Sequence, residues 1–312
     1  MNKSNILVSV CMITYNHEKY IAQAIDSVIM QKTNFDYEIV IGEDCSTDRT
    51  REIVLEYKTK HPDKIKLLLQ EKNVGMMQNF IDTLKACSGK YIALLEGDDY
   101  WTDPNKLQKQ VDFLEVNTEY ALSATRYKIF DENKEIYYYD YGAYLFNKKI
   151  DGIEITLDNF FDPWLTKTLT VIFRKEYFDI GIVNKYKYLR DVHLFFHILL
   201  KGKGYVHNFF SGIYNLNDGG VWGYKDSYHK IKIQYNIYKE LYFENKSILI
   251  LKKKYLEQLS FLMIYSVRHK KYNNFQELSQ SIIEYTKESK SFNKTIILLI
   301  KLLYHRVRCL FL

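Results

Sequence analysis

Glu96, Asp98 and Asp99 place three carboxylates within four residues, directly after an apolar run at residues 91–95. Mutual repulsion makes this grouping costly unless a cation lies among the carboxylates. Carboxylate oxygens are hard ligands that suit Mg²⁺ or Mn²⁺, and such an ion commonly takes one or two protein carboxylates together with substrate phosphates. The alternative is a solvated turn, which Gly97 would permit. The buried strand expected just before the pair favours a divalent-metal site at Asp98 and Asp99.

The surrounding chain alternates between strand and helix patterns. A continuous apolar run rich in β-branched residues predicts a strand buried on both faces at residues 7–13. Further strands are predicted at residues 38–41, 65–69 and 91–95. Amphipathic spacing and N-capping residues predict helices at residues 20–29, from Ser46-Thr47-Asp48 to about residue 60, and at residues 75–86. Asp103-Pro104 predicts the start of a further helix, with Asp103 as N-cap and proline in the first helical position.

Strands that alternate with helices predict right-handed crossovers and a mostly parallel sheet with helices on both faces. Polar residues follow three of the predicted strands: Thr14, Tyr15 and Asn16 the first, Glu43 and Asp44 the second, and Glu96, Asp98 and Asp99 the fourth. In open α/β sheets, ligands bind at the edge formed by the carboxyl ends of the strands. The acidic stretch is therefore expected at the rim of a ligand cleft.

Asp44 has two interpretations. Its carboxylate can accept hydrogen bonds from a base or a ribose, or it can cap the helix predicted after Asp48. A strand followed by an acid also occurs in dinucleotide-binding folds, but these require a glycine-rich first turn. The first turn here, TYNHEKY, contains no glycine, which argues against an oxidoreductase.

The bulk composition, with 47% hydrophobic and 26% charged residues, is typical of a globular protein. No run of about 18 apolar residues predicts a membrane span. Four cysteines without metal-ligand spacing predict reduced thiols in a cytosol. The 28 tyrosines accompany many Lys, Asn and Ile residues and are best explained by a biased genome. Charge is uneven, because residues 225–312 carry 17 Lys and Arg against 7 Asp and Glu while the remainder is net acidic.

Four stretches in order identify a family. They are VSVCMITYNHEKYIAQAIDSVIMQ, EIVIGEDCSTDRT, KNVGMMQNF and GKYIALLEGDDYWTDPNKLQKQVDFL, within about residues 6–130. Together they resemble the inverting family 2 glycosyltransferases of the GT-A fold. The resemblance implies a Rossmann-like α/β domain, with a mostly parallel sheet between helices, that binds a sugar nucleotide. The resemblance also explains how repulsion among the carboxylates at residues 96–99 could be relieved. A diphosphate beside two carboxylates is tolerable only with a cation between them.

The resemblance also implies roles for single residues. Thr14 and Tyr15 match the start of the nucleotide pocket, with the tyrosine against the base, and Asp44 matches the acid that contacts uracil. Asn79 lies in the helix that closes over the nucleotide. Asp99 matches the metal ligand, and Asp98 matches a residue of the metal motif that lies nearer the ribose. The family often has Asp where this chain has Glu43 and Glu96, so no direct contact is assigned to either.

The second half supplies a candidate base in KYLRDVHLFFHILLKGKGYV. In the family an acidic residue opens a helix that runs to a glycine turn and another strand, and Asp191 occupies that position. It would deprotonate the acceptor hydroxyl; the alternative is a carboxylate that only stabilises the helix N-terminus. Related sequences often carry Tyr-Arg-x-His before the paired glycines, whereas this chain has Tyr214-Asn215-Leu216-Asn217, which weakens a histidine ligand or phosphate-binding arginine there.

Other residues of the second half carry less specific expectations. Trp164 and the stretch TLTVIF at residues 168–173 are expected in the acceptor wall, where Trp164 either stacks on a sugar or anchors the core. His193, His197 and His207 lack paired ligand spacing, so helix packing is expected for all three.

The segment after residue 224 predicts a basic helical extension. Its end, TIILLIKLLYHRVRCLFL, mixes aliphatic residues with Lys301, His305, Arg306 and Arg308. Such a segment can lie on an anionic membrane surface, where lipid-linked acceptors would be found, or pack on the catalytic domain. No nucleic-acid-binding module is recognisable.

The sequence thus predicts a GT-A domain at residues 1–224 and a C-terminal helical extension at residues 225–312. The expected function is metal-dependent, inverting transfer of a hexose or N-acetylhexosamine from a UDP-sugar to a cell-surface glycan or lipid-linked glycan, with Mn²⁺ or Mg²⁺ as cofactor. The expected location is the cytoplasm or the inner face of the plasma membrane. The alternatives are a non-catalytic sugar- or nucleotide-binding protein on the same scaffold, and a nucleotidyltransferase.

Overall fold

A computed structural model describes residues 6–147, 149–161, 164–217, 226–269, 275–291, 293, 295, 297–299 and 301–302. The chain divides into two compact units. The sheet unit comprises Met1–Lys185 and Arg190–Asn217, and the helical unit comprises Tyr186–Leu189 and Asp218–Leu312. The predicted boundary at residues 224 and 225 lies outside the described residues and stays a prediction.

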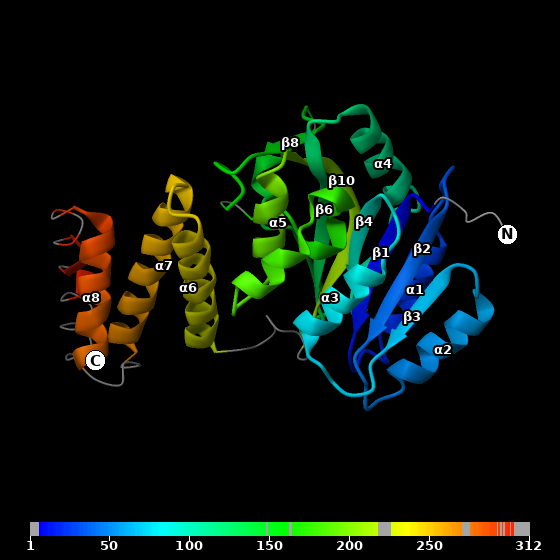
Figure 1. Ribbon diagram of the computed structural model, residues 1–312, viewed down its shortest axis with the longest axis horizontal. Helices are drawn as coiled ribbons and strands as arrows, with labels where there is room; N and C mark the ends of the chain where they lie inside the picture. The colour runs from blue at the N-terminus through cyan, green and yellow to red at the C-terminus, as the bar shows by residue number, and fades with distance from the viewer. Residues whose placement is uncertain are drawn as a thin grey trace. The chain divides into compact units, whose positions relative to one another are not determined.

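The sheet unit is built on one mixed sheet (Figure 1). Its strands are β1 (Val8–Thr14), β2 (Tyr37–Glu43), β3 (Ile65–Leu69), β4 (Tyr91–Glu96), β5 (Tyr100–Trp101), β6 (Tyr120–Asp131), β7 (Ile136–Tyr139), β8 (Gly152–Ile155), β9 (Ile172–Arg174) and β10 (Lys203–Leu216). The spatial order is β3-β2-β1-β4-β9-β6-β10-β5, with β7 beside β6 and β8 beside β10. The pairings of β1 to β4 and the long β6–β10 pairing are parallel, whereas β5, β7, β8 and β9 pair antiparallel. The predicted α/β architecture is confirmed.

The helices of this unit are α1 (Ile21–Ile29), α2 (Thr50–Lys60), α3 (Met76–Ala86), α4 (Lys106–Val116) and α5 (Asp191–Leu199). Short 3₁₀ turns follow in the connecting segments: η1 (Ala143–Leu145), η2 (Thr168–Thr170), η3 (Lys175–Tyr177) and η4 (Ile180–Lys185). The strands and helices predicted up to residue 96 are present, because hydrophobic periodicity decides element type in a strongly alternating segment. The predicted cap of α2 is wrong, since its N-cap is Arg49 rather than Ser46, Thr47 or Asp48.

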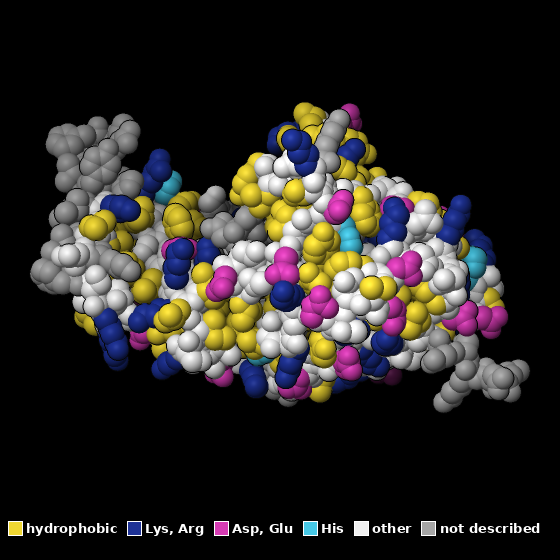
Figure 2. Space-filling model, turned by 90° about the horizontal axis from the view of Figure 1, so that it is seen from above, with side chains coloured by type: hydrophobic (Ala, Val, Ile, Leu, Met, Phe, Trp, Pro, Cys, Tyr) yellow, Lys and Arg dark blue, Asp and Glu magenta, His cyan; other side chains and the backbone are white. Residues whose placement is uncertain are grey.

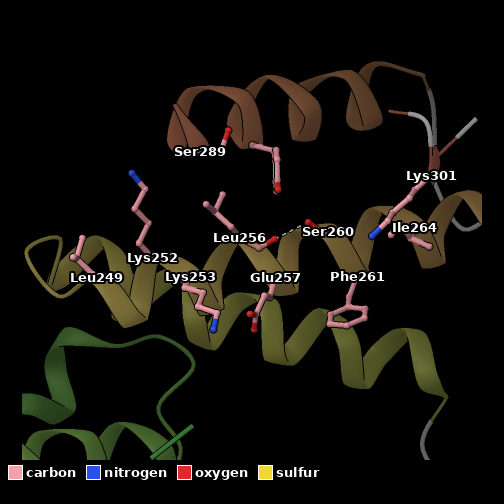
Figure 3. A pocket seen from close by; sticks show the side chains of 11 residues that line it. Leu249, Lys252, Lys253, Leu256, Glu257, Ser260, Phe261, Ile264, Ser289 and Lys301 are labelled. Atoms are coloured by element: carbon pink, nitrogen blue, oxygen red, sulfur yellow. Dashed lines mark hydrogen bonds between the residues drawn. The ribbon is translucent and has the colours of Figure 1, made fainter. Parts of the chain in front are cut away.

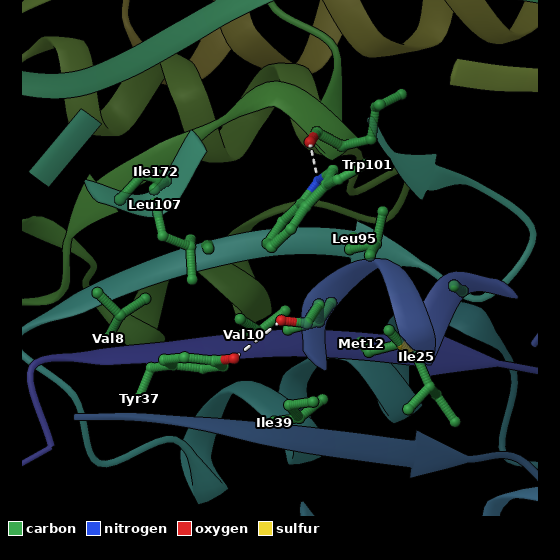
Figure 4. Close-up of a cluster of buried hydrophobic side chains, with 14 of the residues drawn as sticks. Val8, Val10, Met12, Ile25, Tyr37, Ile39, Leu95, Trp101, Leu107 and Ile172 are labelled. Atoms are coloured by element: carbon green, nitrogen blue, oxygen red, sulfur yellow. Dashed lines mark hydrogen bonds between the residues drawn. The ribbon is translucent and has the colours of Figure 1, made fainter. Parts of the chain in front are cut away.

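Helices cover both faces of the sheet. Alternate side chains of a strand point to opposite faces, and Val8, Val10 and Met12 of β1 join one buried cluster with residues of α1, α2 and α4 (Figure 4). On the opposite face, Gly42 of β2 lies so close to α3 that a Cβ there would collide with Thr83. The predicted two-sided covering is therefore present.

Two polar groups are satisfied inside that cluster. The Tyr37 hydroxyl donates to the Val28 carbonyl at 2.9 Å, and the Trp101 indole donates to the Leu169 carbonyl at 2.7 Å (Figure 4). Since an unpaired buried donor is costly, these bonds allow two large aromatic residues to fill the core.

The predicted start of the helix after β4 is wrong. α4 begins at Lys106, with Asn105 rather than Asp103 as N-cap, and Pro104 lies before the helix. The Asp103 carboxylate instead accepts a hydrogen bond from the Asn105 backbone N–H at 2.9 Å and pairs with Lys109 at 2.7 Å. Asp103 therefore forms a local turn, which competes with capping for the same side-chain oxygens.

The turn after β1 works without glycine because Asn16 has a positive φ of 54°. Asparagine tolerates this left-handed conformation better than most residues. Its side-chain oxygen accepts from the Thr47 N–H at 2.8 Å, and its own N–H donates to Ser46 Oγ at 3.0 Å. The loops that follow β1 and β2 are thereby joined.

The helical unit contains α6 (Ser227–Glu244), α7 (Leu249–Arg268) and α8 (Phe275–Ser289). Tyr242 and Tyr255 stack with ring centroids 5.3 Å apart, and the Tyr255 hydroxyl donates to Glu284 of α8. Glu284 also pairs with Lys239 of α6 at 2.8 Å. Contacts between tyrosines and carboxylates therefore join the three helices, and the expected helical character is confirmed.

Charged side chains of both signs mingle on the surface. On the face shown in Figure 2, Lys and Arg side chains are interspersed with Asp and Glu side chains across the described part of the chain. None of the helices in that part is both long enough and apolar enough to cross a membrane.

The Arg174 side chain links several elements of the sheet unit through hydrogen bonds. It is buried, and its guanidinium donates to the Tyr120 carbonyl at 2.8 Å, to the Tyr91 hydroxyl at 3.0 Å and to the Leu114 carbonyl. These bonds link β9 to β4, to β6 and to the end of α4. Removing the guanidinium would leave several buried acceptors unpaired.

We expect Arg174→Met to lower the free energy of unfolding by about 3 kcal/mol, since each unsatisfied buried group costs roughly 1–3 kcal/mol. Urea unfolding followed by circular dichroism measures the change. Arg49→Met is the matched control, because Arg49 pairs with Glu52 at the exposed surface and should leave the midpoint unchanged. Equal midpoints for the two variants would contradict the bracing role.

Candidate active site

Strand register brings the polar residues to one edge of the sheet. In the pairings of β1, Thr14 lies opposite Glu43 of β2, and Ile13 lies opposite Glu96 of β4. The strands are parallel, so their carboxyl ends meet at the same edge. The sheet edge expected to carry the ligand cleft is thus the edge where these side chains gather.

Asp98 and Asp99 are held by β10. The Asn215 backbone N–H donates to Asp99 Oδ1 at 2.9 Å, and the Asn215 side chain donates to the Asp98 carbonyl at 2.6 Å. Asn217 donates to Asp98 Oδ2 at 3.2 Å. Each carboxylate therefore has one oxygen oriented by an asparagine, and neither second oxygen has a hydrogen bond or ion pair with another of the described residues.

The carboxylates raise one another's pKa. Burial, and then the charges of Asp98 and Glu96, hold the pKa of Asp99 well above its usual value. Burial likewise raises the pKa of Glu96 to about 7, with the charges of Asp98 and Asp191 adding to the effect. The ionised cluster is thus unfavourable by itself, as expected of groups that await a cation.

Asp191 belongs to the same cluster. It is the first residue of α5, and that helix runs to a turn at Gly202 before β10, as predicted. Its Oδ1 accepts from the Val192 N–H at 2.9 Å. Burial raises the pKa of Asp191, while the charges of Lys167 and Arg190 and the hydrogen bond from Val192 oppose that rise.

Lys167 is a cation that the sequence analysis did not single out. Its charge lowers the pKa values of Glu96, Asp99 and Asp191. Its ammonium group lies 3.5 Å from the centroid of the Tyr214 ring, and no carboxylate of the described residues lies within 4.0 Å of it. Its carbonyl accepts from the Thr170 N–H and hydroxyl, which fixes the backbone at the start of η2.

The predicted nucleotide residues at the end of β1, Thr14 and Tyr15, occupy two environments. Thr14 is buried, and its hydroxyl lies 3.2 Å from His17 Nδ1. His17 Nε2 lies 3.9 Å from Asp98 Oδ2, so the imidazole connects Thr14 with the acidic cluster. Tyr15 is exposed, as a residue that stacks on a ligand would have to be in the free protein.

Asp44 caps neither the helix predicted after Asp48 nor any part of α2. Its two carboxylate oxygens accept from the Val74 N–H at 2.7 Å and the Gly75 N–H at 3.0 Å, at the start of α3. The capping alternative is therefore wrong, and Asp44 instead positions the loop before α3. Its contact with a base stays a prediction.

Asn79 and Glu43 are buried. The Asn79 amide donates to the Gly42 carbonyl at 2.8 Å and thereby joins α3 to β2. Glu43 accepts from the Ser46 N–H at 2.6 Å and pairs with Arg51. In the structure both side chains bind protein groups, and a nucleotide contact for Asn79 stays a prediction.

The residues fit a divalent cation. Asp98 and Asp99 offer oxygen ligands from adjacent residues, and the charges of Asp98 and Glu96 add to the rise that burial causes in the pKa of Asp99. No group of three or more His, Cys, Asp or Glu residues within the described ranges has the arrangement of a complete metal site. Two carboxylates are enough for Mg²⁺ or Mn²⁺ when a substrate diphosphate supplies further oxygens.

Several expectations for the acceptor side need correction. Residues 169–173 are buried in η2 and β9, so they form the core rather than an acceptor wall. Trp164 packs on Phe160, with ring centroids 4.9 Å apart, which supports the anchoring alternative. His193 and His197 lie on α5 as expected, whereas His207 lies on strand β10 and contacts Ser123 Oγ at 3.0 Å.

Sequence reasoning missed His17, Lys167, Asn215 and Asn217 as members of the site. The two asparagines stand where the chain departs from the Tyr-Arg-x-His pattern, and that departure was a usable signal. His17 follows the polar turn after the first strand. No local pattern distinguishes Lys167, because it approaches Glu96 and Tyr214 only through the fold.

Three comparisons with known proteins bear on this geometry. A family model described as "Glycosyl transferase family 2" matches residues 9–178. Among curated proteins, "Uncharacterized protein Rv1520" of Mycobacterium tuberculosis is 46% identical over 112 residues, which cover 36% of this chain and 32% of that protein. "Putative glycosyltransferase EpsE" of Bacillus subtilis is 36% identical over 125 residues, covering 40% and 44%.

A third relative carries a more specific name. It is the "UDP-Glc:alpha-D-GlcNAc-diphosphoundecaprenol beta-1,3-glucosyltransferase WfgD" of Escherichia coli, 35% identical over 127 residues, which cover 41% of this chain and 48% of that protein. The chain spans less than half the length of each of these curated relatives.

Among solved structures, S. aureus TarS residues 1–349 in complex with UDP-GlcNAc matches with a TM-score of 0.65 and 20% identity. The match covers 97% of this chain and 88% of that one. At this identity the likeness establishes a common fold, and the covered length includes the C-terminal helices.

Proposed function

The chain belongs to glycosyl transferase family 2, and we propose that it transfers a hexose or N-acetylhexosamine from a UDP-sugar to a cell-surface glycan. The observation that supports the proposal is the pair Asp98 and Asp99, which Asn215 and Asn217 orient at the carboxyl edge of the sheet. Asp191, at the start of α5, and Lys167 lie near enough to this edge to act on the charge of Glu96. Two neighbouring carboxylates can serve a diphosphate through a metal, and the third can serve an acceptor hydroxyl.

Asp191 would act as the base. Its carboxylate would take the proton of the acceptor hydroxyl while that oxygen attacks the anomeric carbon from the side opposite the diphosphate. One displacement of this kind inverts the anomeric configuration. A carboxylate is basic enough, because the acceptor oxygen loses its proton as the bond to an electron-poor carbon forms.

Asp99 and Asp98 would hold Mg²⁺ or Mn²⁺. When bound, such an ion supplies positive charge to the departing diphosphate, so that the leaving group requires no proton. Asn215 and Asn217 would keep the two carboxylates in orientation through the hydrogen bonds described above. Tyr15 and Asp44 would contact the base, and Thr14 and Asn79 would shape the nucleotide pocket.

The proposal is tested by UDP release. The full-length protein is incubated with Mn²⁺, an acceptor extract from a bacterial envelope and a panel of UDP-sugars, and UDP is assayed enzymatically. We expect acceptor-dependent release from one UDP-sugar, and a product whose anomeric configuration by NMR is opposite to that of the donor. A product that retains the configuration would contradict single displacement.

The same assay separates the alternatives. A nucleotidyltransferase would release pyrophosphate from a nucleoside triphosphate and a sugar phosphate. A binding protein on this scaffold would bind UDP-sugars without releasing UDP. Either result would replace the proposed reaction.

Lys167 gives a prediction about the diphosphate. Cleavage adds one negative charge to the leaving group, and Lys167 is a cation whose charge acts on Glu96, Asp99 and Asp191 around the proposed site. A charge-assisted hydrogen bond contributes about 1.5–3 kcal/mol. We therefore expect Lys167→Met to weaken UDP binding by about 10-fold or more in calorimetry, with uridine binding unchanged.

Lys109→Met is the matched control, because Lys109 also lies over an aromatic ring, that of Phe209 at 4.5 Å. It should bind UDP as the wild type does. Equal UDP affinity for Lys167→Met and wild type would remove Lys167 from the diphosphate site. A parallel loss of uridine affinity would mean that the substitution acts on the fold.

We further propose that the helical unit contacts an anionic membrane, where a lipid-linked acceptor would be found. A groove of about 550 Å³ lies along α7, and its lining includes Lys252, Lys253 and Lys301 together with apolar Leu256 and Phe261. Figure 3 shows Lys252 and Leu256 pointing from α7 towards α8. Basic side chains beside exposed apolar ones are typical of membrane-surface segments.

The membrane prediction concerns charge reversal. Because each basic residue near an anionic surface contributes roughly 1 kcal/mol, we expect Lys252→Glu/Lys253→Glu/Lys301→Glu to weaken binding to phosphatidylglycerol liposomes by about 100-fold in sedimentation.

Three lysines of the same unit outside the groove provide the control, Lys230→Glu/Lys232→Glu/Lys246→Glu. This control should bind the liposomes more tightly than the groove variant. If both triple variants lost the same liposome affinity, binding would depend on net charge alone. If the wild type did not bind the liposomes, the proposed membrane contact would be contradicted.

A further inference from the structure

An exposed aromatic surface lies on the hairpin formed by β6 and β7. Tyr137 and Tyr139 of β7 are 54% and 65% exposed. The Tyr137 ring lies 4.7 Å from that of Phe130, and the Tyr139 ring lies 5.7 Å from that of Phe210. We call these four residues the aromatic strip. Exposed rings in such a group are uncommon on a surface without a binding function.

Strand register explains why the strip forms one face. Phe130 lies opposite Tyr137, and Lys128 lies opposite Tyr139, in the antiparallel β6–β7 pairing. Side chains two residues apart on a strand share a face. Tyr138 therefore points to the other face, together with its partner Ile129, which is buried.

Two basic side chains of β6 contact the Phe210 ring of the strip. The Arg126 guanidinium lies 4.3 Å from the centroid of the Phe210 ring and pairs with Asp140 at 3.0 Å. Lys128 lies 5.7 Å from the same centroid. Two cations of β6 thus contact the Phe210 ring, and such contacts favour one orientation of that ring.

The strip is continuous with the acidic site. Phe130 lies opposite Asn215 in the β6–β10 pairing, and Asn215 donates to the Asp99 carboxylate. At the same end, Tyr137 lies near enough to Tyr100, the residue that follows Asp99, to add to the rise that burial causes in the pKa of Tyr100. A ligand that covers the strip would therefore reach the site where the proposed transfer takes place.

We propose that the aromatic strip is a subsite for the acceptor glycan, with sugar rings stacked on Tyr137 and Tyr139. This inference rests on the proposed function, which requires an acceptor beside the acidic cluster. It assigns a substrate-binding role to tyrosines that composition alone would attribute to a biased genome.

The chemistry of a sugar chain suits this surface. A pyranose ring has an apolar C–H face and a rim of hydroxyl groups, and a tyrosine has an apolar ring with a polar hydroxyl. Tyrosine also provides a large contact area at a low cost in conformational entropy. Alternate side chains of one strand are about 7 Å apart, so the two tyrosines present successive platforms to an extended chain. A partner protein or a second copy of this chain is the competing occupant.

Affinity electrophoresis tests the subsite without knowledge of the natural acceptor. Full-length protein is run through native gels that each contain one soluble polysaccharide: hydroxyethylcellulose, dextran, mannan, laminarin, xylan or glycol chitin. We expect at least one polysaccharide to retard the wild type. Tyr137→Ala/Tyr139→Ala should bind that polysaccharide at least 10-fold more weakly. Tyr138→Ala is the matched control, with the same residue type on the same strand but on the opposite face, and should behave as the wild type does.

Three outcomes would overturn the inference. They are unchanged wild-type mobility in every gel, equal retardation of the wild type and the double variant, and a lower molecular mass for the double variant in light scattering, which would identify an interface between copies. Calorimetry with UDP keeps this test apart from that of the proposed function. The double variant should bind UDP as the wild type does, whereas a wild type that binds glycan but not UDP would contradict the donor site alone.

Discussion

Asp99→Asn should reduce sugar transfer by about 10³-fold, since a metal ion at a departing diphosphate contributes several kcal/mol to the transition state. The amide keeps the shape of the side chain and can keep the hydrogen bond from the Asn215 N–H, but it lacks the charge that would hold a cation. Initial rates with saturating UDP-sugar, acceptor and Mn²⁺ measure the loss. Full turnover by this variant would remove Asp99 from the metal site.

Stability provides a second readout for the same substitution. Burial and the neighbouring charges raise the pKa of Asp99 well above its unfolded value, so its stabilising contribution is complete below about pH 3.9 and is lost as pH rises through the folded pKa. Asparagine resembles the protonated acid at every pH. In EDTA at pH 8, Asp99→Asn should therefore melt at a higher temperature than the wild type. A lower melting temperature would mean that the lost activity reflects damage to the fold.

Asp191→Asn should lower kcat by about 10²–10⁴-fold, which is the usual contribution of a positioned base. UDP affinity should be unchanged, because Asp191 would contact the acceptor rather than the nucleotide. The structural alternative, a carboxylate that only stabilises the start of α5, predicts a small change in melting temperature and no loss of transfer. Rates and UDP calorimetry on the same preparation distinguish the two.

The pH profile extends this prediction. A base must be ionised, so kcat/KM should be full above the pKa of Asp191 and fall as pH decreases through it. Burial raises that pKa, which places the fall above the range of an exposed aspartate. Lys167 opposes the rise, so Lys167→Met should move the fall to higher pH. If kcat/KM fell at the same pH in the wild type and in Lys167→Met, an effect of Lys167 on the pKa of Asp191 would be contradicted.

The first half of the fold could be predicted from the sequence because its signals are local. Buried parallel strands appear as continuous apolar runs, and α1 and α3 show regular amphipathic spacing. The exception at Asp103 has a local cause as well, since its side chain closes a turn with Asn105 instead of capping the helix. Competition between capping and turn formation is not visible in the residue types alone.

The site was predictable only where residues adjoin the strand ends. Asp98, Asp99 and Thr14 follow apolar runs, and their meeting at one edge follows from parallel topology. Lys167 and Asn215 reach the same place from distant parts of the chain, through the segment before η2 and the β6–β10 pairing. Contacts of this kind depend on tertiary register, which a single sequence does not encode as a pattern. The buried Arg174, which braces three elements, was missed for the same reason.

The acceptor region was hardest to predict because its expected wall lies in the core. The stretch TLTVIF has the apolar character of a binding wall and of a buried strand alike, and β9 takes the second role. The exposed rings lie instead on β7, where Tyr137 and Tyr139 alternate with Tyr138. The burial of the side chains, and not the residue types, distinguishes the buried stretch TLTVIF from the exposed rings of β7.

Metal-dependent binding of UDP tests the central claim most directly. Calorimetry of the wild type with UDP is carried out once with Mn²⁺ and once with EDTA, and repeated with Asp99→Asn. We predict binding by the wild type that is at least 10-fold tighter with Mn²⁺ than with EDTA, and no such gain for Asp99→Asn. Equal affinity with Mn²⁺ and EDTA, or no binding under either condition, would contradict a metal–diphosphate site at Asp98 and Asp99.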